Sequence, residues 1–346
     1  MPGSRIALDL MGGDKAPGAI LRGALEACSP LGGLRIAPER LVLVGDLPRI
    51  ESLLAETGGN PGFELRHAGE VIEMGDSPAA ALRRKPDSSI AGCVGAVKRG
   101  EAGAAVSMGN TGAFVGAATL GLGTLEGVRR PCIAVTLDLT GHPVTLLDMG
   151  ANISPKPEHL LHNAVMGSVY ARDCLGKQNP RVALLNIGTE ESKGTELLKE
   201  ARGLIEASGL HFVGNLEAGD LFDDVAEVVV TDGFTGNVVL KLLEGFAEFM
   251  MQLVMRELRT HDVSWGGEAL ANVRKNIDYS EYGGALLLGV RGVAVIGHGR
   301  SDEIAVANAI ALACRALDAG VNEHIVEGLT AAAGSLRGES PPAARA

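Results

Sequence analysis

The sequence predicts an α/β fold with a mostly parallel sheet, because strand-like and helix-like segments alternate along almost its whole length. Five times, a short apolar run ends in a turn rich in Gly, Asn, Asp or Thr, and that turn opens into a helix. The five segments are residues 5–14, 104–112, 182–194, 228–237 and 293–302. The 48 glycines suit such tight turns and close helix–sheet contacts.

These turns also indicate a kind of chemistry. In a parallel sheet the carboxyl ends of the strands lie along one edge, so polar turns there can meet around one crevice. Helix N-termini at that edge offer unpaired N–H groups and a positive dipole end, which favour an anion such as phosphate. The first interpretation is therefore an α/β enzyme that binds an anion.

Other elements follow from apolar periodicity and turn residues. Ser77 is the predicted cap of a helix that begins at Pro78. The remaining predictions are strands at 41–45 and 62–68, a helix with Ile50, Leu53 and Leu54 on one face, a hairpin of strands 131–138 and 143–148 joined by 139–142, a helix at 155–175, and a helical apolar stripe within 245–258.

Length allows about two domains or one large unit. No change in composition marks a linker and no repeat of fixed period is present. We therefore expect residues 1–330 to form one catalytic unit, divisible into two lobes around one cleft. Residues 331–346, rich in Ala, Gly, Ser and Pro, are expected to be a disordered tail.

Composition excludes several classes of function. The net charge of −11 argues against broad nucleic-acid binding. The five cysteines are far apart, which predicts reduced thiols rather than a disulfide framework or metal site. His159 and His162 share a helix face but have no third ligand nearby. Arg5 and Asp9 interrupt the first apolar stretch, so we expect no signal peptide, no spanning helix and an intracellular protein.

Two of the turns have residues suited to phosphate. The paired Gly12 and Gly13 let backbone approach an anion, although they can equally make a tight turn. Asn110 stands between glycines and can bind a ligand through its amide. Thr111 is first expected to cap the following helix, with ligand contact as the alternative.

Three further turns have candidate catalytic groups. Lys193 can neutralise a phosphate or an oxyanion, or can simply be solvated. Asn237, in a turn with Asp232 and Thr235, can polarise a carbonyl group. His298 suits acid–base chemistry or the positioning of its loop. Glu190 and Glu191 can act as a base, but acidic residues are common near helix N-termini.

In order along the chain, these segments resemble the bacterial phosphate acyltransferase family, often called PlsX. The matching segments are 9–17, 68–78, 107–113, 147–152, 156–161, 166–170, 186–194, 232–237, 242–245, 278–284 and 298–302. The resemblance implies a three-layer α/β/α sandwich with a Rossmann-like sheet, similar to isocitrate dehydrogenases and phosphotransacetylases.

The resemblance further implies that phosphate attacks a long-chain acyl thioester on acyl carrier protein, forming acyl phosphate for phospholipid synthesis. It implies a cytoplasmic homodimer at the inner membrane face, which supplies a membrane glycerol-3-phosphate acyltransferase, and no metal or organic cofactor.

By the same resemblance, Lys193 and Asn237 are the catalytic residues. Phosphate binding is assigned to Gly12, Gly13, Asn110 and Thr111. Further substrate-binding residues are Asp14, Asp232, Thr235 and His298. The sequence departs from the family pattern at Leu10, Pro86, Met108 and 296–297, none of which removes a proposed catalytic group.

Alternatives remain at this point. A phosphotransacetylase that uses short acyl-coenzyme A has the same chemistry. A nicotinamide-dependent dehydrogenase lacks its G-x-G-x-x-G motif here, and a non-catalytic acyl-carrier or membrane-binding protein is the third possibility. Arg83, Arg84 and Lys85 are either a docking site for the acidic carrier or a solvated helix end. The stripe that includes Phe246 is interpreted first as core or dimer packing, with lipid contact as the alternative.

Overall fold

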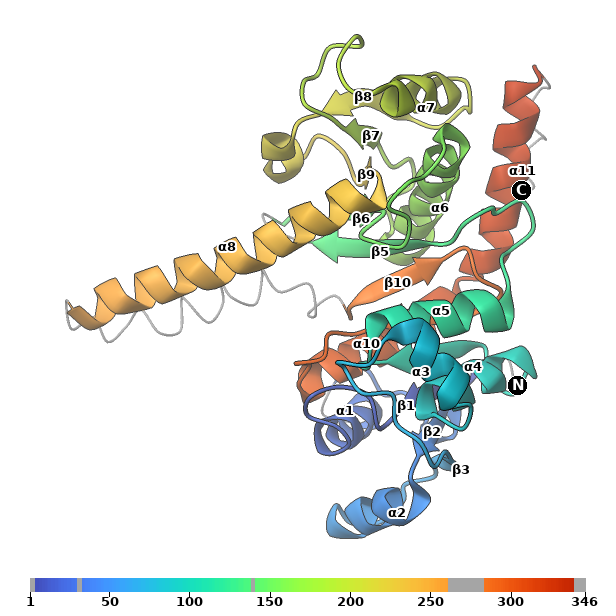
Figure 1. The fold of residues 1–346 in the computed structure, drawn as a ribbon, viewed down its shortest axis with the longest axis vertical. Helices are drawn as coiled ribbons and strands as arrows, with labels where there is room; N and C mark the ends of the chain where they lie inside the picture. The colour runs from blue at the N-terminus through green and yellow to red at the C-terminus, as the bar shows by residue number, and fades with distance from the viewer. Residues whose placement is uncertain (1–3, 30–32, 138–140, 261–282, 339–346) are drawn as a thin grey trace. The chain divides into compact units, whose positions relative to one another are not determined.

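The chain folds into two compact units, each with a mostly parallel sheet and packed helices (Figure 1). The computed structural model describes residues 4–29, 33–137, 141–260 and 283–338. The first unit is formed by residues 1–131 and 282–326, and the second by 132–281 and 327–346. The predicted α/β fold is therefore confirmed. The turn 139–142 and the motif 278–284 lie partly outside the described residues.

The sheet of the first unit has the strand order β3-β2-β1-β4-β11-β10, and every neighbouring pair is parallel except β11 and β10. Its strands are β1 (Ile6–Asp9), β2 (Leu41–Gly45), β3 (Glu64–His67), β4 (Ala104–Ser107), β10 (Ala285–Leu288) and β11 (Val293–Ile296). Its helices are α1 (Gly18–Cys28), α2 (Leu47–Glu56), α3 (Pro78–Arg84), α4 (Ser89–Lys98), α5 (Thr111–Leu122) and α10 (Glu303–Asp318), with a 3-10 turn at Pro38–Arg40. The central strands are apolar and fully buried, as in a sheet covered on both faces.

Two successive residues of β2 show that helices cover both faces of this sheet. A Cβ on Gly92 of α4 would lie 2.7 Å from Val44, whereas a Cβ on Gly45 would lie 3.4 Å from Ile50 of α2. Successive residues of a strand point to opposite faces. The helices α4 and α2 therefore pack on opposite sides, in agreement with the predicted three layers.

The sheet of the second unit has the order β5-β6-β9-β7-β8, in which only β5 is antiparallel to its neighbour β6. The predicted hairpin is confirmed by this β5–β6 pair. The strands are β5 (Cys132–Leu137), β6 (Val144–Leu147), β7 (Val182–Leu185), β8 (Phe212–Leu216) and β9 (Val228–Val230). The helices are α6 (Pro157–Leu175), α7 (Glu196–Glu206) and α8 (Gly233–Thr260), with a 3-10 turn at Ala218–Phe222.

Some predictions need correction. The helix α11 (Val321–Leu336) continues to Leu336, so residues 331–336 are helical rather than part of a tail. Ser77 precedes α3 but makes no side-chain capping bond. Phe246 and Phe249 of α8 are exposed in the single chain, so core packing within the chain is the wrong interpretation for them.

The cysteines agree with the prediction of free thiols, because all five are unbridged. Burial raises the pKa of Cys93 and of Cys132, which keeps both thiols protonated. In the described part of the chain, no group of three His, Cys, Asp or Glu side chains is arranged to hold a metal ion. No single helix there is long and apolar enough to cross a membrane, and only the bent pair α10–α11 meets that length and composition together.

Candidate active site

The predicted site residues of the first unit lie at the carboxyl ends of three neighbouring parallel strands. We call this the first edge, and define it as the turns 10–14, 108–112 and 297–302 after β1, β4 and β11. It includes Gly12, Gly13, Asp14, Asn110, Thr111 and His298. Because β4 pairs with both β1 and β11, the three turns are side by side.

Asp9 organises the first edge from beneath. It is the last residue of β1 and fully buried, and its Oδ1 accepts hydrogen bonds from the N–H groups of Met11 (3.0 Å) and Gly12 (3.1 Å). Its Oδ2 accepts a hydrogen bond from the Ser107 hydroxyl at 2.7 Å, which ties the turn after β1 to β4. Burial raises the pKa of Asp9, although these hydrogen bonds oppose the shift.

Gly12 and Gly13 are required by the backbone at this edge. A Cβ on Gly12 would lie 2.5 Å from an Asp9 carboxylate oxygen and 2.8 Å from the Cα of Gly109. Gly13 has φ of +105°, a conformation that favours glycine. Both glycines thus make a tight turn, in which Gly12 is buried and Gly13 is partly exposed.

Asn110, not Thr111, caps α5. The Asn110 Oδ1 accepts a hydrogen bond from the N–H of Ala113 at 3.0 Å, and its Nδ2 lies 3.0–3.2 Å from the carbonyl oxygens of Glu73, Met74 and Asp76. All polar atoms of the Asn110 side chain are therefore engaged, and the residue fastens the loop before α3 to α5. Thr111 is the first helical residue and exposed, which leaves its hydroxyl accessible.

The turn after β11 closes the first edge. The N–H of Asp14 donates to the carbonyl oxygen of Gly299 at 2.8 Å, which joins this turn to the one after β1. The His298 Nδ1 accepts a hydrogen bond from the N–H of Arg300 at 3.2 Å. A neutral His298 must then have its proton on Nε2, so that atom is a hydrogen-bond donor.

The second unit has a corresponding edge with the other predicted residues. We call it the second edge, and define it as the turns 148–153, 231–237 and 186–194 after β6, β9 and β7. It includes Lys193, Asp232, Thr235 and Asn237. The strand β9 pairs in parallel with both β6 and β7, so these turns are also neighbours.

Asp148 has the role at the second edge that Asp9 has at the first. It is buried, and its Oδ1 accepts hydrogen bonds from the N–H groups of Ile133 (3.0 Å), Gly150 (3.1 Å) and Ala151 (2.9 Å). Its Oδ2 accepts from both the backbone and side-chain nitrogens of Asn152, at 2.7 and 3.0 Å. Burial raises the pKa of Asp148 against these hydrogen bonds.

The turn after β9 presents Asn237. The Asp232 Oδ1 accepts from the N–H groups of Phe234 and Thr235, and its Oδ2 accepts from the Thr235 hydroxyl at 2.6 Å. Asp232 and Thr235 thus bond to each other and shape the start of α8. Asn237 is exposed, and its amide has no hydrogen-bond partner among the residues that the structure describes.

Lys193 lies on the turn after β7, two residues before Thr195, the N-cap of α7. The Lys193 carbonyl oxygen accepts from the Asn186 side-chain amide at 3.2 Å, and its N–H donates to the carbonyl oxygen of Glu190 at 3.1 Å. The side chain is exposed, and its ammonium makes no ion pair within the described ranges. Glu191, a candidate base, instead bonds to Arg202 at 2.9 Å.

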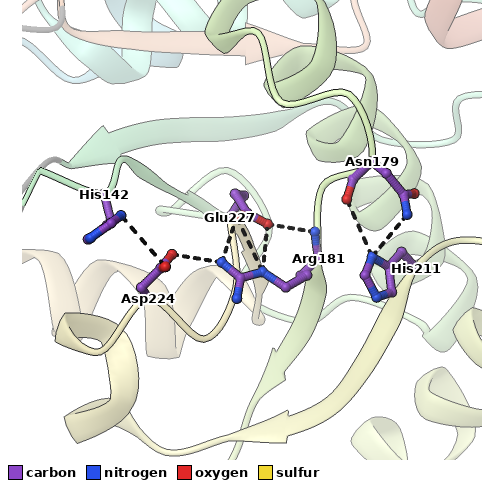
Figure 2. A network of polar contacts seen from close by, with 6 residues as sticks. All are labelled: His142, Asn179, Arg181, His211, Asp224 and Glu227. Atoms are coloured by element: carbon purple, nitrogen blue, oxygen red, sulfur yellow. Dashed lines mark hydrogen bonds and ion pairs between the residues drawn. The ribbon is translucent and has the colours of Figure 1, made fainter.

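The opposite, amino-terminal edge of the second sheet has a different character. Here Arg181 precedes β7, and its guanidinium bonds to Glu227 at 2.6 Å and to Asp224 at 2.7 Å (Figure 2). Burial acts to raise the pKa of Glu227, but the hydrogen bonds from Arg181 outweigh it and leave that pKa lowered. His142 and a second pair, Asn179 with His211, complete this set of polar contacts.

Two findings go beyond or against the sequence predictions. Lys85 bonds to Asp76 (2.7 Å) and to the carbonyl oxygen of Val71 (2.6 Å), so its ammonium is already engaged and is neither a solvated end nor free to dock a partner. The buried carboxylates Asp9 and Asp148 were not predicted as site residues. Their common signal is an Asp at the end of an apolar strand, followed two or three residues later by Gly.

Comparison with known proteins identifies the family of the chain. Residues 4–324 match the family model described as fatty acid synthesis protein. A phosphate acyltransferase from Heliobacterium modesticaldum is 46% identical, over 93% of this chain and 97% of that protein. Another from Anaeromyxobacter sp. is 45% identical, over 98% and 95%. The chain belongs to the phosphate acyltransferase family.

Solved structures support the fold of this phosphate acyltransferase family member. A phosphotransacetylase from Streptococcus pyogenes superposes with a TM-score of 0.61 over 91% of this chain and 94% of that one, at 16% identity. A phosphotransacetylase from Staphylococcus aureus gives 0.58 at 15% identity, over 91% and 94%. The predicted likeness to phosphotransacetylase folds is thereby confirmed, and the chain is an enzyme that transfers an acyl group to phosphate.

Proposed function

We propose that this phosphate acyltransferase takes a long-chain acyl group from acyl carrier protein and transfers it to inorganic phosphate. The observation that supports this proposal most strongly is family membership over nearly the whole chain. The reaction releases acyl phosphate and the free carrier thiol. The reaction needs donors that bind a phosphate anion and donors that polarise a carbonyl group. The first edge has features that suit the phosphate, and the second edge has features that suit the carbonyl group.

The first edge suits the phosphate. The turn after β1 has partly exposed backbone at Gly13, while Gly12 is buried and supports the turn, and α5 begins with the exposed Thr111. N–H groups at a helix start stabilise an anion through hydrogen bonds and the helix dipole. In this proposal Asn110 positions the start of α5 rather than contacting phosphate, while Asp14 and His298 border the anion.

The second edge suits the carbonyl group. A phosphate oxygen attacks the carbonyl carbon, which becomes tetrahedral, and the carbonyl oxygen becomes an oxyanion. The carbon–sulfur bond then breaks, and the proton lost by the phosphate goes to the leaving sulfur. The Lys193 ammonium and the Asn237 amide are donors that have no partner among the described residues, and each such donor lowers the barrier by about 3–4 kcal/mol. Asp232 and Thr235 hold the turn that presents Asn237.

The test mixes the purified full-length protein with palmitoyl-[acyl carrier protein] and phosphate, traps acyl phosphate with hydroxylamine, and measures the hydroxamate by mass spectrometry. We expect a product that depends on phosphate and on the carrier-bound donor. Palmitoyl-coenzyme A and acetyl-coenzyme A are the donor controls. A preference for acetyl-coenzyme A would instead identify a phosphotransacetylase, and no product with any donor would leave a non-catalytic acyl-binding protein.

The cellular setting is part of the same proposal. We assign the enzyme to the cytoplasm, as a homodimer at the inner membrane face that passes acyl phosphate to a membrane glycerol-3-phosphate acyltransferase for phospholipid synthesis. The exposed Leu242, Phe246 and Phe249 of α8 support a covered surface in such an assembly. Light scattering after size exclusion tests the dimer, and sedimentation with anionic phospholipid vesicles tests the membrane contact.

A further inference from the structure

The two edges have the same local arrangement of turns, although the sequence has no repeat of fixed period. In each unit, a buried Asp accepts hydrogen bonds from N–H groups of its own turn. These residues are Asp9, the last residue of β1, and Asp148, which directly follows β6. The adjacent parallel strand, β4 or β9, is followed by a Gly-x-Thr-Gly sequence, at 109–112 or 233–236. In both units these two turns touch at backbone distance, near Gly12 or Gly236.

The two edges can be aligned on their buried Asp and on their Gly-x-Thr-Gly sequence. In this alignment, polar residues of the first edge correspond to apolar residues of the second. Asp14 of the first edge corresponds to Ile153 of the second, and Asn110 corresponds to Phe234. Asp14 and Asn110 are polar, whereas Ile153 is 71% exposed and Phe234 is 64% exposed. The apolar residues next to Asp9 and Ser107 at the first edge, Leu10, Met11 and Met108, are all buried.

A third exposed apolar residue belongs to the second edge. Ile187, on the turn after β7, is 82% exposed, and its neighbour Gly188 packs against the stem of Lys193, since a Cβ there would lie 3.0 Å from Lys193 Cγ. The N–H of Gly233 donates to the carbonyl oxygen of Asn152, which holds the turns of Ile153 and Phe234 together. Exposed apolar side chains gathered on neighbouring loops mark a binding surface more often than chance.

We propose that Ile153, Ile187 and Phe234 form the subsite for the first methylenes of the acyl chain, and so favour a longer acyl group over acetyl. This inference rests on the proposed function. Lys193 and Asn237, on the same turns, are assigned to the carbonyl group, and the hydrocarbon begins one bond from that carbonyl carbon. The turns that present the oxyanion donors are thus the ones that must also contact the first part of the chain.

The test measures kcat/KM for acetyl, octanoyl and palmitoyl thioesters of one acyl carrier protein. Each methylene that the subsite removes from water strengthens binding by up to about fourfold, so kcat/KM rises with chain length in the unchanged enzyme. The variants are Ile153→Thr, Ile187→Thr and Phe234→Asn, the last one placing the residue of the matched position in the first edge. Leu120→Asn is the control, because Leu120 is 83% exposed but lies on α5 of the first unit and is not part of the second edge.

We expect each variant to lower kcat/KM about tenfold for octanoyl and palmitoyl and less than about threefold for acetyl, because acetyl has no methylene to place in the subsite. The KM for phosphate and the melting temperature stay unchanged, and Leu120→Asn behaves as the unchanged enzyme. The subsite would be overturned by an equal loss with all donors, or by no loss with any of them. It would also be overturned if the unchanged enzyme showed no preference among chain lengths. No acyl phosphate from the unchanged enzyme with any donor would instead overturn the proposed function itself.

Discussion

The first and second edges use the same backbone device to present different chemistry. Each edge fixes a turn with a buried aspartate, packs it against the start of a helix on the neighbouring strand, and leaves a few side chains outside. At the first edge these side chains are polar and the apolar ones are buried. At the second edge Ile153, Ile187 and Phe234 are exposed around Lys193 and Asn237.

This difference separates what specifies the scaffold from what specifies the reaction. The buried carboxylates, the close glycines and the apolar strands are common to both edges and hold the backbone there. The exposed residues are free of that role, so they can differ between the edges and divide an anion and an acyl group between them. Substitutions in the two sets should therefore affect different measurements.

The largest effect is expected from the shared device. Asp148→Asn should lower the free energy of unfolding by about 3 kcal/mol, because an amide cannot accept the buried N–H groups that face both carboxylate oxygens. Asp9→Asn should cost less, about 2 kcal/mol, because the Ser107 hydroxyl can rotate toward another acceptor whereas N–H groups cannot. Urea unfolding followed by circular dichroism measures both.

The control for these two substitutions is Asp46→Asn, at the exposed N-cap of α2. Asparagine caps helices as well as aspartate, so this variant should unfold like the unchanged protein. If all three variants were equally stable, the carboxylates would not hold the edges and the shared plan would have no energetic meaning.

The next effect should appear in turnover and not in stability. Lys193→Ala and Asn237→Ala should each lower kcat by at least ~10²-fold, equivalent to about 2.7 kcal/mol, through loss of an oxyanion donor. Both residues are exposed, so unfolding curves should be unchanged. Lys199→Ala on α7 is the matched control, since Lys199 pairs only with the exposed Glu196. Near-normal turnover in folded Lys193 and Asn237 variants would remove them from the mechanism.

Much of the fold was predictable because its signals are local. Buried runs such as 41–45 and the pair of short strands around 139–142 depend on apolar patterns and turn residues, and the structure has β2 and the β5–β6 hairpin there. The helical end at Leu336 was missed because composition rich in small residues resembles a tail, although α11 packs its Gly328 against Val165.

The candidate site was predictable at its turns but not in its bonding. Sequence placed Asn110 and Thr111 at a helix start, yet could not tell that Asn110 would cap α5 and hold Glu73, Met74 and Asp76. Those partners lie more than thirty residues away. The pairing of Asp232 with Thr235 was equally hidden, because the same residues in a turn can face a ligand or each other.

A smaller effect should distinguish the two edges of the second sheet by pH. The pKa of Glu227 is lowered from its ordinary value of 4.5, so the folded state binds that proton more weakly than the unfolded state. Its pairing with Arg181 therefore stabilises the fold above pH 4.5 and loses this effect as the pH falls through the lowered pKa. Glu227→Gln should lower the free energy of unfolding by about 2 kcal/mol at pH 7, and by less at pH 3.

For this prediction, Glu196→Gln is the control, because the Glu196–Lys199 pair is exposed and should contribute less than about 1 kcal/mol at any pH. A loss in Glu227→Gln that stays constant between pH 7 and pH 3 would mean that packing, not charge, accounts for it.

The smallest effects compare the two threonines of the Gly-x-Thr-Gly turns. Thr235→Val should lower the free energy of unfolding by about 1 kcal/mol, since its hydroxyl donates to Asp232, and should leave the KM for phosphate unchanged. Thr111→Val should do the reverse: its exposed hydroxyl has no structural bond to lose, but the KM for phosphate should rise about tenfold, as expected for one hydrogen bond to a charged ligand. If Thr235→Val raised that KM as much as Thr111→Val, the assignment of phosphate to the first edge alone would be wrong.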